Sequence, residues 1–531
     1  MATFPAPVGG LNIADNLVMM PATDATVMRN VISQPYGVEL RKGNVRHATD
    51  LNSGEPVHTL VEHLTANSAT APKLYAFAGD EMYEISAPGD AARVASLTGL
   101  SNAVWNGPRV NNASGANRIL FNGVDNGIWI KNDFTIARIT AAAIPGSPVA
   151  GELDGVSPQS IIGGTVHQKR VWLIEKNSTK GWYLAPEALS GAATMFDFGT
   201  IFLRGGHLAV LATWTVDSGS GLDDMLVAIS SEGDIVVYAG VDPGSGTPGD
   251  WVLKGVFSAG RPLSQRAVVR KEGDLLIMTQ FGLLSLSKAI SSDSFSDANS
   301  GAYLSRKIQY TLGQLATDLP TTFGWEILPS PNNNLVIVNV PMTTESGQFV
   351  QSSITGGWSQ FDGWDALCWC KFGEHTVYGD RDGNVWRALE GYTDGAIQSD
   401  ATTITNGEPV LGEVQTSFNF FQSLSAVKHA KMVRPTFIGG SKVDYAIMVN
   451  PDFDYDAATT PGISGILGES LWGTALWGTD SWAGTGMSGT QHVWTGVPGI
   501  GSAFALRLAI RAAKPVLWAS YDIMYEEGHG I

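Results

Sequence analysis

Residues Arg118–Ile130 read RILFNGVDNGIWI and show most clearly how this chain folds. Two short apolar segments, Arg118–Phe121 and Gly127–Ile130, enclose a run rich in Asn, Asp and Gly. β-Branched and aromatic residues favour strands, and Asn-Gly pairs supply the positive φ angles that tight hairpin turns need. The stretch therefore predicts a β-hairpin.

The same pattern recurs between residues 70 and 391. Each copy has a short apolar strand, a turn with Gly, Asp or Asn, and a second strand that usually carries an aromatic residue. The matching first-strand residues are Leu74, Ile119, Val171, Leu226, Leu275, Leu335 and Val377. They are 42 to 60 residues apart, close to the period of about 40–50 residues in four-stranded propeller blades. We therefore predict an all-β fold, a degenerate six- or seven-bladed β-propeller over residues 56–391.

The two ends of the chain, residues 1–55 and 392–531, lack this repeat. In the first, Asp24–Asn30 is a candidate helical turn and Tyr36–Gly43 reads as a strand bounded by glycines. The second contains expected strands near Val414–Phe421, Val443–Met448 and Phe504–Ile510. Because a propeller begins and ends near one place, we expect the N-terminal arm to pack with the C-terminal region as an additional β domain.

Composition agrees with this fold and narrows the function. The 531 residues include 62 Gly and 16 Trp, and only 16% are charged, which favours short strands and tight turns. The start lacks the pattern of a signal peptide, and no run of about 18 apolar residues predicts a membrane span. The net charge is −17, from 50 acids and 33 bases. That charge disfavours a protein that grips nucleic acid. It is typical of an ordinary acidic protein, and it would also suit a protein past which DNA slides.

Motifs of catalysis are missing from the sequence. There is no Gly-x-Ser-x-Gly elbow, phosphate-binding loop, dinucleotide fingerprint or His-Glu-x-x-His. The segment Asp380–Asn384 resembles part of a calcium loop, but it lacks the distal Glu and reads as a hairpin turn. Cys368 and Cys370 are expected to be reduced and buried, since two ligands alone make no zinc site. We expect no enzyme activity, no cofactor and no metal.

A Gly-rich insertion at about residues 465–495 holds the first interface candidates. Its central part, Leu471–Trp482, reads LWGTALWGTDSW, so that Trp472, Trp477 and Trp482 recur every five residues. Neither a helix face nor a strand face repeats at five, and the segment therefore predicts a loop with aromatic anchors. These anchors either form a small core under the loop or contact another subunit or partner.

Basic residues form two weak clusters: Arg261, Arg266, Arg270 and Lys271, and then Lys428, Lys431 and Arg434. Solvated faces are the ordinary interpretation. The alternative is a salt-bridged seam between subunits, or positive spots that touch phosphates after oligomerisation. Arg261, Lys428 and Arg434 are our candidates for such an interface.

Ten stretches spread over most of the chain form a further pattern: Gly9–Asn12, Met20–Ala25, Gly37–Gly43, Trp251–Gly255, Gly260–Leu263, Gly273–Thr279, Phe281–Ser287, Gly357–Phe361, Gly379–Val385 and Tyr521–Gly528. Together they resemble the tail nozzle family of short-tailed phages (podoviruses), also called tail tubular protein B or packaged-DNA stabilisation protein. The resemblance implies a homohexamer in the virion tail, assembled in the host cytoplasm. It would sit below a dodecameric adaptor ring, carry tail fibres or spikes, and pass double-stranded DNA through its centre without reading its sequence.

The function expected from the sequence is therefore a structural virion protein that conducts DNA during ejection and helps to retain packaged DNA. Two other hypotheses stay open. One is a glycan-binding or depolymerising tail protein built on a propeller. The other is a bacterial propeller that scaffolds partners as a monomer.

Overall fold

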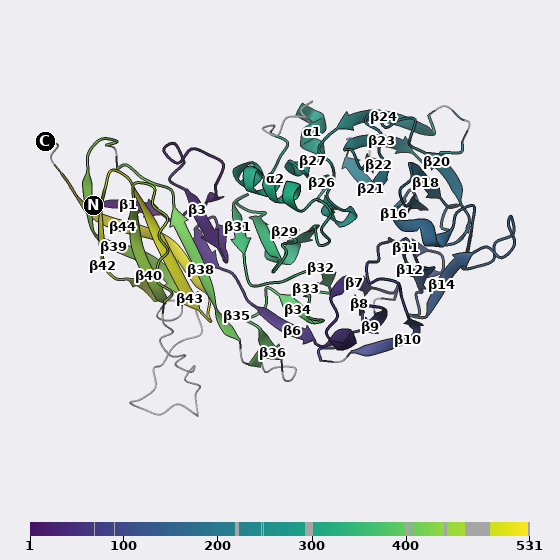
Figure 1. The fold of residues 1–531 in the computed structure, drawn as a ribbon, viewed down its shortest axis with the longest axis horizontal. Coiled ribbons are helices and arrows are strands. Elements are labelled where there is room, and N and C mark those ends of the chain that lie inside the picture. The colour runs from purple at the N-terminus through teal and green to yellow at the C-terminus, as the bar shows by residue number, and fades with distance from the viewer. Residues whose placement is uncertain are drawn as a thin grey trace.

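The computed structural model is built almost wholly of strands, arranged as a ring of small sheets beside a β-sandwich (Figure 1). It describes the chain apart from residues 68, 90, 218–221, 246, 248, 293–300, 399–403, 406, 422, 440–442, 462–488 and 529–531. The predicted fold class, an all-β propeller with an additional β domain, is confirmed. In the described part of the chain, no helix is both long and apolar enough to cross a membrane.

The described residues form seven propeller blades, and Figure 1 looks down their common axis. The innermost strands are β7 (Val57–His63), β11 (Arg109–Asn112), β16 (Ile161–His167), β21 (Leu208–Asp217), β25 (Val268–Lys271), β28 (Glu326–Ser330) and β32 (Cys368–Phe372). The second strands are β8 (Lys73–Ala78), β12 (Gly115–Leu120), β17 (Arg170–Glu175), β22 (Leu222–Ser230), β26 (Asp274–Thr279), β29 (Leu335–Val340) and β33 (His375–Gly379). These second strands contain the seven residues from which the repeat was recognised.

The outer strands complete the blades. The third strands are β9 (Glu81–Glu84), β13 (Gly127–Ile130), β18 (Lys180–Tyr183), β23 (Asp234–Gly240), β27 (Gly282–Ser285), β30 (Gly347–Ser352) and β34 (Val385–Ala388). The fourth strands are β10 (Ala92–Thr98), β14 (Ile136–Ala141), β20 (Thr194–Asp197), β24 (Trp251–Ser258), β31 (Trp358–Phe361) and, in the seventh blade, β6 (Asn44–Ala48). The fifth blade has three strands in the described chain, and the helices α1 (Leu286–Ser292) and α2 (Gln309–Asp318) follow it.

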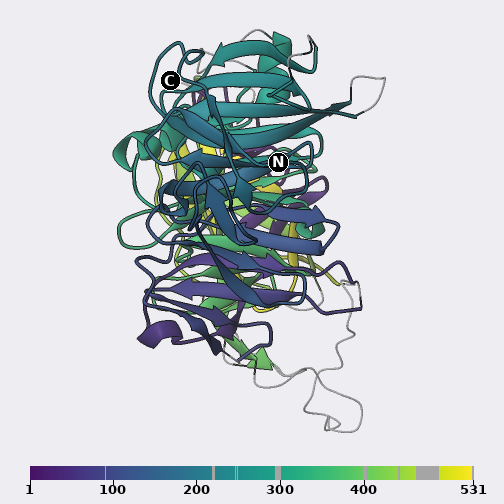
Figure 2. The ribbon, with the colours of Figure 1, turned by 90° about the vertical axis from the view of Figure 1, so that its right-hand side faces the viewer.

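Apolar clusters between neighbouring blades hold the ring together. Between the seventh and the first blade, for example, Val377 and Val385 share a core with Val57 and Leu74. Because each blade is apolar on both faces, the ring has to close before every face is buried. Figure 2 looks onto the rim of the propeller, on the side away from the sandwich.

The ring is closed by a strand from the N-terminal arm. Strand β6 pairs antiparallel with β34, so that Val45 lies opposite Arg387 and Ala48 opposite Val385. The expected domain limits placed this strand in the arm, whereas the structure places it in the seventh blade. The hairpin pattern could not reveal it, because its partner lies more than 300 residues away in the chain.

The sandwich is built from both ends of the chain (Figure 1). One sheet contains β1 (Ala2–Pro5), β4 (Val31–Gln34), β5 (Gly37–Leu40), β39 (Lys428–Gly439), β41 (Gly489–His492), β42 (Thr495–Gly501) and β44 (Val516–Glu527). The other contains β2 (Gly10–Leu11), β3 (Asp24–Arg29), β35 (Thr393–Asp394), β38 (Glu408–Thr416), β40 (Asp444–Pro451) and β43 (Phe504–Ala512). This second sheet continues into the sixth blade, because β3 also pairs with β31.

The helical turn expected at Asp24–Asn30 is wrong. The segment forms β3, with Ala25 and Met28 buried, and pairs with β38. Backbone pairing and burial override the local preference of a short segment. Minor elements complete the chain: β15 (Glu152–Asp154), β19 (Gly191–Ala192), β36 (Ala396–Gln398), β37 (Ile404–Thr405), and the 3-10 turns η1 (Leu51–Ser53), η2 (Pro158–Ser160), η3 (Gln265–Ala267), η4 (Arg306–Ile308) and η5 (Pro331–Asn333).

Candidate functional sites

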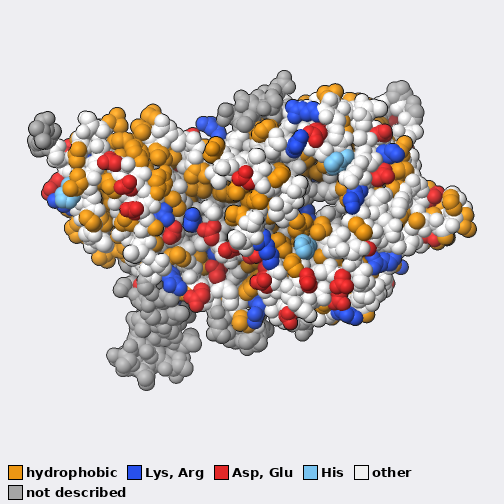
Figure 3. Space-filling view, viewed as in Figure 1, with side chains coloured by type: hydrophobic (Ala, Val, Ile, Leu, Met, Phe, Trp, Pro, Cys, Tyr) orange, Lys and Arg blue, Asp and Glu red, His pale blue; other side chains and the backbone are white. Residues whose placement is uncertain are grey.

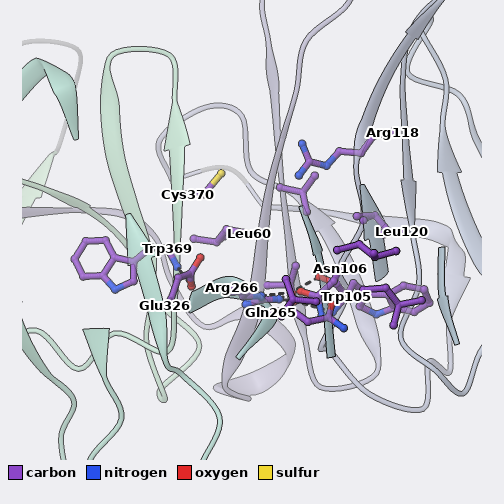
Figure 4. Close-up of a pocket in the computed structure, with 17 residues that line it drawn as sticks. Leu60, Trp105, Asn106, Arg118, Leu120, Gln265, Arg266, Glu326, Trp369 and Cys370 are labelled. Carbon is purple, nitrogen blue, oxygen red and sulfur yellow. Dashed lines mark hydrogen bonds between the residues drawn. The ribbon is translucent and has the colours of Figure 1, made fainter. Parts of the chain in front are cut away.

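A cavity of about 280 Å³ lies on the propeller axis (Figure 4). Its walls come from β7, β12, β16, β17, β21, β28 and β32 and from the turn η3. A DNA duplex, whose major groove alone is about 12 Å wide, does not fit such a space. The propeller axis therefore holds a small pocket that is too narrow for a DNA duplex.

Arg266 closes this axis. It lies in η3, ahead of the fifth blade, and its guanidinium reaches across to the first two blades. Its Nη1 donates to the carbonyl of His58 at 2.7 Å, and its Nη2 to Thr59 Oγ1 at 2.8 Å and the carbonyl of Trp105 at 3.1 Å. Its Nε donates to Asn106 Oδ1 at 2.9 Å. The interpretation of this basic cluster as a solvated face is wrong for Arg266.

The carboxyl group of Glu326 and the thiol of Cys370 line the same cavity. Burial raises the pKa of Glu326 to about 7, although the charge of Arg266 and a hydrogen bond from the amide of Trp369 lower it. That bond joins Glu326 Oε2 and Trp369 N at 3.0 Å. Burial also raises the pKa of the Cys370 thiol to about 12, so the thiol is protonated at neutral pH and is a poor nucleophile.

The predicted interface residues lie in different environments, and some lie outside the described residues. Trp472, Trp477 and Trp482 lie outside the described residues. Arg261 lies on the propeller with its side chain 60% exposed, in an ion pair of 2.7 Å with Glu232. Such an exposed pair contributes little to stability and leaves Arg261 accessible to another molecule.

Lys428 is buried, which contradicts its expected place on an exposed seam. Its Nζ donates to the carbonyls of Ser423, Ala426 and Ser502 at 2.7, 2.9 and 3.0 Å. Burial lowers its pKa, while the charges of Glu527 and Asp452 raise it. The ammonium group therefore uses all three of its donors in hydrogen bonds that connect the loops at one end of the sandwich.

Arg434 does lie on a surface. It is the cross-strand partner of Asp522, and its Nε lies 2.8 Å from Asp522 Oδ2. Although burial would raise the pKa of Asp522, hydrogen bonds from Thr3 and Arg434 and the charge of Arg434 hold it below its usual value. The guanidinium carbon of Arg434 also lies 4.9 Å from the ring centre of Trp494.

Apolar side chains surround this ion pair. Ile500, on β42, is 65% exposed, and Met524, on β44, is 39% exposed. Met432 on the intervening β39 is the direct partner of Met524. We call Met432, Arg434, Trp494, Ile500 and Met524 the outer sandwich face. Figure 3 shows hydrophobic side chains gathered over the sandwich. Among these residues the sequence had singled out only Arg434, because strand register decides which side chains share a face.

The segment Asp380–Asn384 forms the turn between β33 and β34. The Asp380 carboxylate accepts from the amides of Asp382 and Asn384 at 2.9 and 2.8 Å, and from Trp386 Nε1 at 2.7 Å. Its oxygens are thus used within the turn. Across the part of the chain that the structure describes, no three His, Cys, Asp or Glu side chains gather as metal ligands would. Both cysteines are free, Cys368 buried and Cys370 half-buried.

Comparisons with known proteins give structural likeness only. No family model matches the chain, and no curated protein sequence matches it. Among solved structures, PorZ, a bacterial surface component of the type-IX secretion system of Porphyromonas gingivalis, is similar at 12% identity and a TM-score of 0.36. That match covers 72% of this chain but only 44% of PorZ. YCF48 bound to D1 peptide is similar at 10% identity and a TM-score of 0.33, over 70% of this chain and 99% of YCF48.

Proposed function

We propose that this protein is a structural subunit of a tail nozzle, a hexameric tube through which a short-tailed phage ejects its DNA. In this role it has no catalytic task. It would sit in the virion tail below the adaptor ring, carry tail fibres or spikes, and help to retain packaged DNA. The ten stretches that resemble the nozzle family motivate the proposal.

The outer sandwich face is the structural feature that best supports this proposal. Trp, Met and Arg are among the residues enriched at protein interfaces. Here Trp494, Met432, Met524 and Arg434 share one surface with the exposed Ile500. An exposed apolar surface of this kind is expected to be covered in the assembled state. A neighbouring subunit is the partner that the nozzle requires.

The closed axis and the charge also support this role. Because the propeller axis holds only a small cavity, which the Arg266 side chain crosses, DNA has to pass between subunits, along the symmetry axis of the assembly. The net charge of −17 suits the wall of that tube, since strong phosphate contacts would slow the DNA. The pairing of β3 with β31 joins sandwich and propeller in one sheet, so that each subunit can resist load as a single body.

Native mass spectrometry tests the assembly. We expect six copies, either of the purified protein alone or after addition of the adaptor, and the same protein in purified virions. The substitutions Ile500→Glu and Met524→Glu should shift the population to monomers, because each places a charge in the interface core. Leu203→Glu is the matched control, since Leu203 is 76% exposed and lies on the propeller.

A protein that stays monomeric with the adaptor present and is missing from virions would rule the nozzle out. If Leu203→Glu lost assembly to the same extent, the propeller surface and not the outer sandwich face would be the interface.

A further inference from the structure

Arg118 lies in the axial cavity with donors to spare. It is half-buried on β12, and Figure 4 shows its side chain reaching into the space between the blades. Its Nη1 donates to the carbonyl of Glu62 at 3.3 Å, whereas its Nε is enclosed and has no hydrogen-bond partner. Burial costs a guanidinium group its hydration, and here it lowers the pKa of Arg118, although the nearby charge of Glu62 raises it.

A second guanidinium group, outside the cavity lining, lies next to Arg118. Arg109 on β11 is the direct cross-strand partner of Arg118, and like charges opposite each other are unfavourable. Neither arginine forms an ion pair with a described acidic residue. The carboxylate of Glu62 accepts instead from the amide of Gly373 at 2.8 Å. Burial, with the charges of Arg118 and Arg109 opposing protonation, lowers the pKa of the nearby His63 to about 4.

The opposite side of the cavity offers a different partner. There the carboxyl group of Glu326 is held by the Trp369 amide and faces the cavity (Figure 4). A volume of about 280 Å³ has room for roughly nine waters at ~30 Å³ each, or for a small organic molecule. A molecule in this space can therefore meet a cation at one end and a hydrogen-bonding carboxyl group at the other.

We propose that the axial cavity binds a small organic anion, with a carboxylate or phosphate group at Arg118 and a hydroxyl group at Glu326. Planar guanidinium groups suit both kinds of anion. Arg118, Glu326 and Cys370 are all half-buried, so a small molecule can reach them. The proposal is independent of the nozzle function, since the pocket lies within one subunit.

Isothermal titration calorimetry of the whole protein at constant ionic strength tests this. The probes are inorganic phosphate, glycerol 3-phosphate and glycerate. Comparing the first two tests the hydroxyl contact, and comparing the last two distinguishes a phosphate from a carboxylate group. We expect saturable binding, tighter for glycerol 3-phosphate than for phosphate. Arg118→Met should weaken it about tenfold or more, because a charged hydrogen bond is lost. Arg138→Met is the matched control, since Arg138 lies on β14 of the same blade and outside the cavity.

Two further variants sharpen the result. Arg118→Lys keeps the charge and should fold even if Arg118→Met does not, with an intermediate affinity. Glu326→Ala should remove the advantage of glycerol 3-phosphate over phosphate. Binding of only one anionic group supports the proposal and identifies that group. If none of the probes binds saturably up to about 10 mM, or if Arg118→Met binds as the wild type does, the cavity holds water only and the proposal fails.

Discussion

At the scale of single residues, two basic side chains, Lys428 and Arg266, each donate to several backbone carbonyls from separate segments. Lys428 uses three of them, and Arg266 uses two together with the side chains of Thr59 and Asn106. Carbonyls at the ends of strands cannot pair within a sheet, and a buried unpaired carbonyl is costly. A charged donor that reaches several of them therefore ties separate segments together.

Replacing Arg266 should show this most clearly. Arg266→Ala leaves four acceptors across the axis without their donor, and we expect it to lower the free energy of unfolding by about 3 kcal/mol or more. Arg270→Ala is the control, because Arg270 is exposed and donates only to Thr215 Oγ1 in the hydrogen bonds that the structure describes. It should cost less than about 1 kcal/mol. Urea unfolding followed by tryptophan fluorescence measures the free energy of unfolding of both variants. An equal loss in the two would show that the hydrogen bonds of Arg266 across the axis do not stabilise the ring.

Glu326 predicts a pH dependence of stability. Its folded-state pKa, about 7, lies above the ordinary value of 4.5, so the folded protein binds a proton that the unfolded chain releases. Stability from this group is therefore full below about pH 4.5 and is lost as the pH rises to about 7. Glu326→Gln should melt at a higher temperature than the wild type at pH 8, and at a similar temperature at pH 4.5. A constant difference across this range would contradict the prediction.

At the scale of elements, strand β6 decides whether the ring is closed. It supplies the fourth strand of the last blade, and Val45 on it is fully buried. The neighbouring Arg46 points to the other side of the same strand and is half-buried. The two positions therefore form a matched pair on one element.

We expect Val45→Asp to destabilise the protein by roughly 3–5 kcal/mol, because it places an uncompensated charge in a closed core. Arg46→Asp should cost less than about 1 kcal/mol. The melting temperature and limited proteolysis measure the two variants side by side, with cleavage expected first around β32–β34 in Val45→Asp. Equal stability of the two variants would show that closure by β6 contributes little.

At the scale of the whole molecule, the net charge of −17 predicts weak binding to DNA. Acidic and basic side chains intermix on the face shown in Figure 3, without one large basic patch. We expect a dissociation constant for duplex DNA weaker than about 10⁻⁴ M at physiological salt. Fluorescence anisotropy of a labelled duplex measures it. Tight binding that weakens steeply with added salt would contradict a wall past which DNA slides.

The seven hairpins, and hence the propeller, could be predicted from the sequence. A hairpin depends on residues within about a dozen positions, so its strands and turns are visible locally. The same holds for the turn at Asp380, whose ligand-like spacing proved to serve hydrogen bonds within the turn. In contrast, Asp24–Arg29 could not be recognised as a strand, because β38, its partner, lies far along the chain.

Contacts between distant segments determine how the ring closes, which charges are buried, and which apolar residues share a surface. Arg266 meets Thr59 across 207 positions, and β1 meets β44 across more than 500. Strand register then placed Lys428 inside and Arg434 outside, although both lie on β39. Such contacts are set by the folding of the chain as a whole, since burial and pairing are not local properties of a sequence.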